Sequence, residues 1–155
     1  MQLDFQPLLL ELKHPFRLAT GMRTHTNAMM TQISMGGLTG YGEAAMPPYY
    51  GENHQSAAVF LTLAATTLQQ YHYPLSAAMI TAFMQEIDAL APGNHAAKAA
   101  VDIALHDLWG KMEGKPLWAL WGLSPEKMPP TSFTLGIDSP DMLRKKLEEA
   151  GDFQI

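Results

Sequence analysis

The sequence contains no cysteine among its 155 residues. Disulfide bonds and thiolate metal sites are therefore excluded, and a chain without cysteine is typical of the reducing cytoplasm, where we expect this protein. No apolar run reaches the roughly 18–20 residues that span a membrane. The first residues, Met1 to Asp4, lack the basic start and apolar stretch of a secretory signal, so we expect no membrane partner.

Charged residues are scarce, at 16%, and the formal net charge is −5. Acidic and basic residues are interspersed, so the basic stripe of a nucleic-acid-binding protein is missing and we expect no nucleic-acid partner. Hydrophobic residues make up 47%, which is enough for a real core. The length predicts one domain, or one domain and a piece of another.

The common motifs of catalytic and metal sites are also missing. The six histidines show neither HxH nor HExxH spacing, and the glycines match neither GxGxxG nor GxxxxGK. No GxSxG elbow supports serine hydrolase chemistry. Asp102, Asp107 and Glu113 lie along one expected helix, where such a row is more typical of a solvated face than of a metal site. The residues alone therefore indicate no complete active site.

Three strands are predicted near the start of the chain, over residues 3–12, 28–35 and 38–45. Gly36-Gly37 joins the last two and is a hairpin signal. The glycines within the third strand predict a bulge or the close approach of another backbone.

Two irregular segments interrupt this pattern. Residues 14–27 are polar and aperiodic and contain Pro15 and Gly21, so we expect a loop of the kind that often carries function. Residues 47–51 form a second expected loop, after which the apolar period changes from 2 to 3.6.

Helices follow, each with its own start and stop signals. Asn53 predicts the start of a helix over about 54–70, and Ser76 the start of the next. Asn94 is the predicted cap of a helix over about 95–113, which ends at Gly114. A further short helix is expected within 117–123.

The last quarter of the chain follows Pro129-Pro130, a predicted boundary. Residues 131–137 alternate like a strand, and Ser139-Pro140-Asp141 predicts a helix start with its cap. Residues 153–155 resemble the opening of another strand, so the ending is a βαβ unit cut short. Because a lone βα unit cannot bury its faces, we expect the natural protein to continue.

Two motifs carry a family resemblance. Residues 97–111 read AKAAVDIALHDLWGK and residues 114–122 read GKPLWALWG, which resembles the signature of the mandelate racemase/muconate-lactonizing group of the enolase superfamily. Trp121 is a minor departure from this signature, which usually has an aliphatic residue or Phe at that position. Residues 40–44, GYGEA, resemble a second hallmark of that group. Further positions look most like the dipeptide epimerases that act on L-Ala-D/L-Glu, namely Phe16, Arg17, Arg23, residues 131–137 and Ser139-Pro140.

The resemblance implies an α+β fold: an enolase-type capping domain over 1–128, with a three-stranded antiparallel sheet followed by helices, and the start of a truncated (β/α)₇β barrel over 129–155. It also implies an enzyme that abstracts and returns the proton α to a carboxylate, with Mg²⁺ and with lysines as base and acid. The lysines and metal ligands are expected after Ile155. No catalytic or metal residue is assigned in this chain, which we expect to be inactive alone.

The same resemblance assigns substrate binding to four positions. Arg23 corresponds to an arginine that meets the substrate's distal carboxylate, a task suited to a guanidinium fork, with Arg17 as the alternative. Thr134 corresponds to a substrate-contacting threonine, and Tyr49 and Phe16 are expected to line the pocket. The expected partner is a small dipeptide, and a homo-oligomer is possible.

Other functions stay open at this point. Sister activities of the same group are o-succinylbenzoate synthase, N-acylamino acid racemase and muconate cycloisomerase. From another class, the chain could be a non-catalytic structural or binding module.

Overall fold

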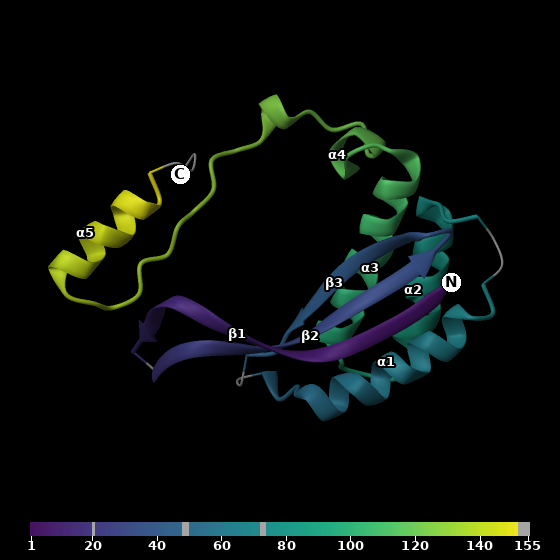
Figure 1. The fold of residues 1–155 in the computed structure, drawn as a ribbon, viewed down its shortest axis with the longest axis horizontal. Helices are drawn as coiled ribbons and strands as arrows, with labels where there is room; N and C mark the ends of the chain where they lie inside the picture. The colour runs from purple at the N-terminus through teal and green to yellow at the C-terminus, as the bar shows by residue number, and fades with distance from the viewer. Residues whose placement is uncertain (20, 48–49, 72–73, 152–155) are drawn as a thin grey trace.

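The computed structural model describes residues 1–19, 21–47, 50–71 and 74–151. Figure 1 shows a three-stranded sheet with helices on one face, followed by an extended segment that leads to a separate C-terminal helix. In chain order the elements are β1 (Gln2–Leu18), β2 (Gly21–Met35), β3 (Leu38–Ala45), α1 (His54–Leu68), α2 (Ala77–Leu90), α3 (His95–Glu113), α4 (Leu117–Leu120), the 3₁₀ helix η2 (Pro125–Lys127) and α5 (Pro140–Glu149). No helix in the described part of the chain is long and apolar enough to cross a membrane.

The sheet is antiparallel with strand order β1-β2-β3. Met35 pairs with Leu38 across a two-residue turn in which Gly36 and Gly37 have φ of 59° and 81°. Both values are positive, the geometry that a tight hairpin requires and that glycine adopts without strain. The predicted antiparallel sheet, its Gly-Gly hairpin and the helices that follow are confirmed.

The prediction of a loop over residues 14–27 is wrong. β1 and β2 continue through it as a long hairpin arm, defined here as residues 12–27, and pairing resumes at Phe16↔Arg23 after a register shift. The described side chains of the arm are exposed or half-buried, so neither face requires the alternating apolar pattern of a core strand. Pro15, which lacks an N–H donor, lies within the irregularity that interrupts the ladder.

Of the caps predicted for α1, α2 and α3, the first two are confirmed. Asn53 Oδ1 accepts hydrogen bonds from the backbone of α1, with Ser56 completing a capping box, and Ser76 caps α2. Asn94 precedes α3 as expected but has φ of 55° and makes no side-chain cap bond. The carboxylate of Glu52 replaces it, accepting the N–H groups of His95 at 2.6 Å and Ala96 at 2.8 Å.

Helix α3 lies directly against β3. A methyl group built on Gly42 would lie 1.9 Å from the carbonyl oxygen of Ala100, and one on Gly40 would lie 2.1 Å from that of Ala104. The predicted close backbone approach is therefore confirmed, and it is the reason that these positions carry no side chain. The core fills the space between the sheet and α1, α2 and α3, and its largest fully buried side chains include Phe60, Phe83 and Ile33.

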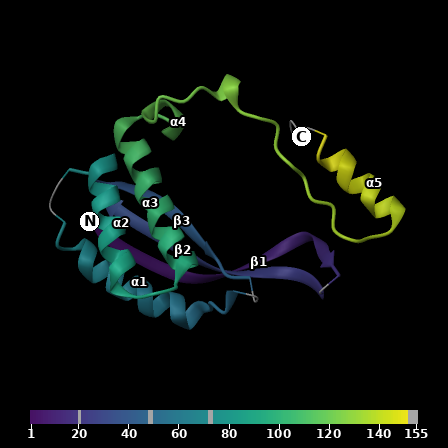
Figure 2. The same ribbon diagram turned by 180° about the vertical axis from the view of Figure 1, so that it is seen from behind.

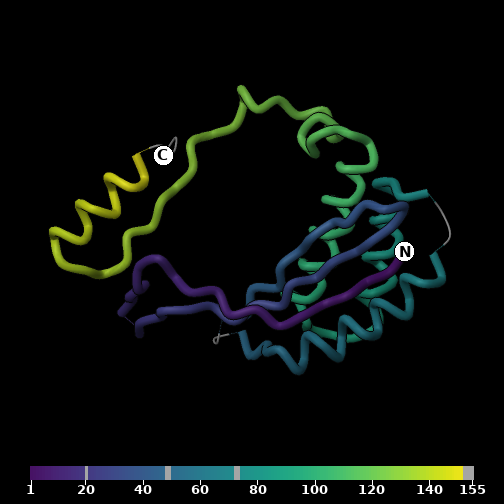
Figure 3. The backbone as a smooth tube through the Cα atoms, viewed as in Figure 1, coloured from purple at the N-terminus to yellow at the C-terminus, as the bar shows by residue number. Residues whose placement is uncertain are grey.

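The C-terminal segment leaves this core altogether. Figures 2 and 3 show the chain after α4 running as an extended segment to α5, which lies beside the tip of the hairpin arm. The strand predicted over residues 131–137 is wrong, because the described residues provide no ladder for it. One backbone bond, from Ile137 N to Arg17 O at 2.8 Å, joins it to the arm. The predicted helix after it is confirmed, with Ser139 capping α5.

The contact between α3 and β3 predicts that Gly42→Ala destabilises the protein. A glycine in a strand is usually replaced by alanine with a gain, but here the methyl group meets backbone that cannot rotate away. We expect a loss of about 3 kcal/mol or more in the free energy of unfolding, measured by urea denaturation. Glu43→Ala, one position along on the exposed face, should change it by less than about 0.5 kcal/mol. Equal effects would contradict the contact.

Candidate functional site

A hollow of about 450 Å³ lies where the hairpin arm meets the C-terminal segment. Its wall includes three of the four residues assigned to substrate binding, Phe16, Arg23 and Thr134. They come from β1, β2 and the extended segment, so residues about 110 positions apart in the chain share one wall only because the arm reaches across. Tyr49, the fourth, lies outside the described residues.

Arg23 is held beside an aromatic ring. Register pairs it with Phe16, and its guanidinium carbon lies 5.8 Å from the centre of that ring, a cation–π distance. Within the described ranges, no ion pair or hydrogen bond of the Arg23 side chain occurs. A half-buried guanidinium without a carboxylate partner is suited to bind an anionic group.

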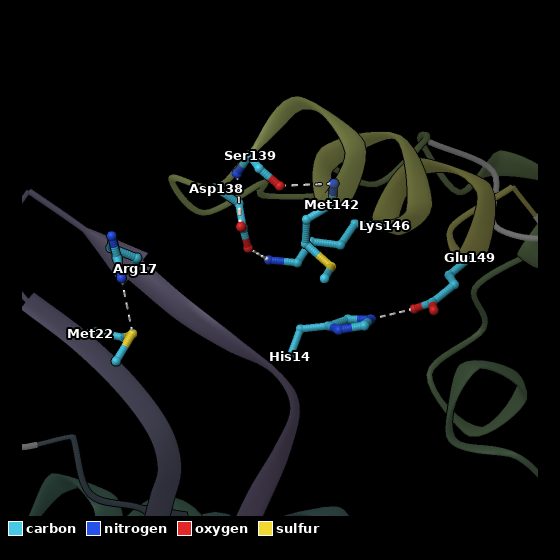
Figure 4. Close-up of polar contacts among 8 residues, drawn as sticks. All are labelled: His14, Arg17, Met22, Asp138, Ser139, Met142, Lys146 and Glu149. Carbon is cyan, nitrogen blue, oxygen red and sulfur yellow. Dashed lines mark hydrogen bonds and ion pairs between the residues drawn. The ribbon is translucent and has the colours of Figure 1, made fainter.

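Arg17, the alternative to Arg23, has a different environment. Its side chain is exposed, it donates a long hydrogen bond to Met22 Sδ at 3.6 Å, and it does not line the hollow (Figure 4). Its backbone contributes more, because its carbonyl oxygen accepts the bond from Ile137. The geometry therefore favours Arg23 over Arg17 as the anion-binding arginine.

Two charge clusters lie at the hollow, and one of them holds the arm against α5. His14 Nε2 lies 2.7 Å from Glu149 Oε2, and Lys13 Nζ lies 2.9 Å from the same oxygen (Figure 4 shows the His14 contact). The hydrogen bond from His14, and then that from Lys13, lowers the pKa of Glu149 to about 2. The carboxylate thus stays ionised and anchors the arm over a wide pH range.

The second cluster lies in the wall of the hollow. The Lys146 ammonium is buried and lies 3.0 Å from a carboxylate oxygen of Asp138. Its hydrogen bond, followed by that of the Ser139 N–H, lowers the pKa of Asp138. Lys146 pairs with Asp138 and Lys13 pairs with Glu149, so among the described residues of the wall Arg23 is the permanently charged side chain without an acidic partner.

Sequence reasoning missed Lys13, His14, Lys146 and Glu149. No motif joins them. Lys13 and His14 of the arm meet Glu149 of α5 only through the tertiary path of the chain, and Lys146 pairs with Asp138 within the C-terminal segment. The signal that could have identified Lys146 is its place on the apolar side of α5, where it is buried.

Arg23 also borders a second, smaller hollow of about 280 Å³. Its wall is formed by residues 22–27 of β2 together with Met46 and Pro47 of the loop after β3. Arg23 therefore borders both the larger hollow at the C-terminal segment and the smaller hollow at the loop that follows β3.

The described residues do not offer a metal site. No group of three His, Asp or Glu side chains converges within them. Of the acidic row on α3, Asp107 accepts the N–H of Tyr41 at 2.8 Å and pairs with Lys111, while Asp102 lies 3.3 Å from His106. These carboxylates are engaged in local pairs, and the Mg²⁺ ligands stay a prediction for residues outside this chain.

A three-stranded antiparallel sheet followed by helices is the fold of an enolase-type N-terminal capping domain. Residues 7–122 match the N-terminal domain of the mandelate racemase / muconate lactonizing enzyme family, and the chain belongs to that family. The resemblance noted in the sequence is confirmed.

Dipeptide epimerases are among the proteins similar to this chain. The chain is 47% identical to the L-Ala-D/L-Glu epimerase of Bacteroides thetaiotaomicron, over 100% of this chain and 39% of that protein. It is 30% identical to the L-Ala-D/L-amino acid epimerase of a Maribacter species, over 96% of this chain and 43% of that protein. The chain thus spans about two fifths of the length of these relatives.

Solved structures agree. A dipeptide epimerase from Cytophaga hutchinsonii, complexed with Mg and D-Ala-L-Val, has a TM-score of 0.77 at 30% identity, covering 94% of this chain and 39% of that one. A substrate-liganded L-Ala-D/L-Glu epimerase from Bacillus subtilis has a TM-score of 0.75 at 26% identity, covering 96% and 41%.

The ion cluster at the arm predicts a pH-dependent stability. The folded pKa of Glu149, about 2, lies below the ordinary value of 4.5, so its stabilising effect is complete above 4.5 and lost as the pH falls toward 2. We expect Glu149→Gln to lower the free energy of unfolding at neutral pH, with the difference from wild type shrinking on acidification. Urea denaturation at a series of pH values measures this. The neighbouring Glu148→Gln, on an exposed side chain, is the matched control, and identical pH profiles for the two variants would refute the cluster.

Proposed function

We propose that the whole protein is a Mg²⁺-dependent dipeptide epimerase acting on L-Ala-D/L-Glu-like substrates, and that this chain supplies its specificity residues. The observation that carries the proposal is Arg23, a half-buried guanidinium that has no partner among the described residues and lines a hollow with Phe16 and Thr134. The epimerase names of the relatives support the reaction, and the 47% identity to an L-Ala-D/L-Glu epimerase supports the acidic substrate.

The chemistry of the hollow suits the side chain of a C-terminal glutamate. Its distal carboxylate would accept two parallel N–H bonds from the guanidinium, a geometry that lysine cannot offer. Phe16 and Phe133 line the same wall and would limit the access of water to a bound carboxylate, which would strengthen the charge interaction. The Thr134 hydroxyl, on the extended segment, is available to donate to a backbone oxygen of the substrate.

The reaction itself needs groups that the described residues do not provide. Removing and returning an α-proton requires a base and an acid on opposite faces of the carbon, and the enediolate needs a bound cation, which Mg²⁺ supplies when present. The buried lysine of the hollow is committed to Asp138, and no metal ligand set converges in the described part of the chain. Base, acid and metal would therefore come from sequence outside this chain, and the chain alone would bind without turnover.

The experiment uses the full-length protein with Mg²⁺ in D₂O. We expect exchange of the α-proton of the C-terminal residue of L-Ala-L-Glu, followed by ¹H NMR. Absence of exchange with every acidic dipeptide would overturn the proposed function.

The role of Arg23 is tested in the same assay with two substrates. Arg23→Ala should lower kcat/KM for L-Ala-L-Glu by roughly 10–100-fold, the effect of losing a hydrogen-bonded charge, and should lower it far less for L-Ala-L-Leu. Arg17→Ala is the matched control and should spare both substrates. Equal losses on the two substrates, or a selective loss in Arg17→Ala, would contradict the assignment.

A further inference from the structure

The loop between β3 and α1, residues 46–53, is attached to the rest of the fold at both ends. At its start, Met46 N donates to the carbonyl oxygen of Asn27 at 3.0 Å. Just past its end, His54 Nε2 donates to the carbonyl oxygen of Ala28 at 2.9 Å. Both acceptors belong to β2, only a few residues beyond Arg23, so the loop is mounted on the strand that carries the anion-binding arginine.

Glu52 adds a third attachment, to α3. Its two carboxylate oxygens accept the N–H groups of His95 and Ala96, which have no helical partner at the start of the helix. The residue in the cap position, Asn94, cannot serve them, because it has a left-handed backbone and its amide donates to Pro92 O instead. Glu52 thus caps α3 from 43 residues away, and the negative charge suits the positive end of the helix.

The helix that Glu52 caps is the one that packs backbone to backbone on the sheet. Helix α3 contacts β3 in this way at Gly40 and Gly42. Gly51, with φ of 73°, makes the turn that brings Glu52 to the start of this helix. Glu52 therefore links the loop to a helix that is itself packed directly on the sheet.

The described residues of this loop lie around the site. Met46 and Pro47 wall the hollow that Arg23 borders, and Tyr50 and Glu52 line a neighbouring hollow of about 380 Å³ with His95 and Ala96. A shift of the loop would therefore alter the hollow whose wall Met46 and Pro47 share with Arg23.

We propose that Glu52 is a positioning residue that, by capping α3, fixes the loop wall beside Arg23 and so sets the affinity for the substrate's C-terminal residue. This inference rests on the proposed function for its kinetic consequence. Its structural part, the attachment of the loop to α3, is independent of the reaction.

The kinetic test compares three variants of the full-length protein with Mg²⁺ and L-Ala-L-Glu. Glu52→Ala should raise KM about fivefold or more, the equivalent of a lost helix cap, and leave kcat within about twofold. Glu52→Gln should recover part of the affinity, because its amide oxygen accepts one of the two N–H bonds. Ser76→Ala is the matched control. It removes the cap of α2, where Ser76 Oγ accepts the N–H of Met79 at 3.3 Å, far from the site.

The control separates positioning from stability. Ser76→Ala should lower the unfolding temperature as Glu52→Ala does, yet leave KM unchanged. An unchanged KM in Glu52→Ala, or an equal rise in Ser76→Ala, would overturn the inference.

Hydrogen–deuterium exchange decides the structural part even if the protein turned over no dipeptide. Glu52→Ala should speed exchange at the amides of His95 and Ala96. It should also speed exchange at Met46, whose N–H donates to Asn27 O of β2, and at Tyr50, whose N–H donates to Pro47 O. Ser76→Ala should leave these amides protected. Unchanged protection at Met46 and Tyr50 in Glu52→Ala would overturn the inference, whereas failure of the proposed function alone would leave this result intact.

Discussion

The contact of helix α3 with strand β3 at Gly40 and Gly42 is the constraint on which the rest of this structure depends. It brings two backbones closer than any side chain would allow, and so fixes the longest helix on the sheet. The sheet continues from that fixed point into the hairpin arm, which carries Arg23. The start of the same helix takes the Glu52 carboxylate, which holds the loop beside that arginine.

The arm shows how a simple element produces a site. A hairpin that ended at the edge of the core would leave Phe16 and Arg23 in solvent and away from Thr134. Because β1 and β2 continue beyond the core, the arm meets α5 through the contacts of His14 and Lys13 with Glu149. Phe16 and Arg23, the residues proposed to set specificity, thus lie on paired strands, and backbone hydrogen bonds set their position.

The sequence could predict features that depend on interactions between residues close together in the chain. The Gly-Gly hairpin, the Asn53 and Ser76 caps and the helix stop at Gly114 are decided within a few residues, and each is confirmed. The family motif located Phe16, Arg23 and Thr134, which one hollow brings together, although their binding roles stay predictions. The boundary at residue 128 also stays a prediction.

The errors arose where distant parts of the chain decide. Asn94 is the right residue type for a cap, but its backbone is left-handed and Glu52 takes its place. Residues 14–27 have no strand period because the arm has no buried face, and residues 131–137 have that period but no neighbouring strand among the described residues. The apolar period of a sequence reflects which side chains are buried. Strand pairing also requires a partner strand, which the period does not reveal.

The central claim, that this chain selects an acidic dipeptide through Arg23, is tested most directly by a crystal structure of the full-length protein with Mg²⁺ and L-Ala-L-Glu. The account predicts that the distal carboxylate of the glutamate lies within hydrogen-bond distance of the Arg23 guanidinium, about 2.7–2.9 Å, with Phe16 stacked behind it. A substrate carboxylate bound by Arg17 or by a barrel residue, with Arg23 turned to solvent, would contradict the account.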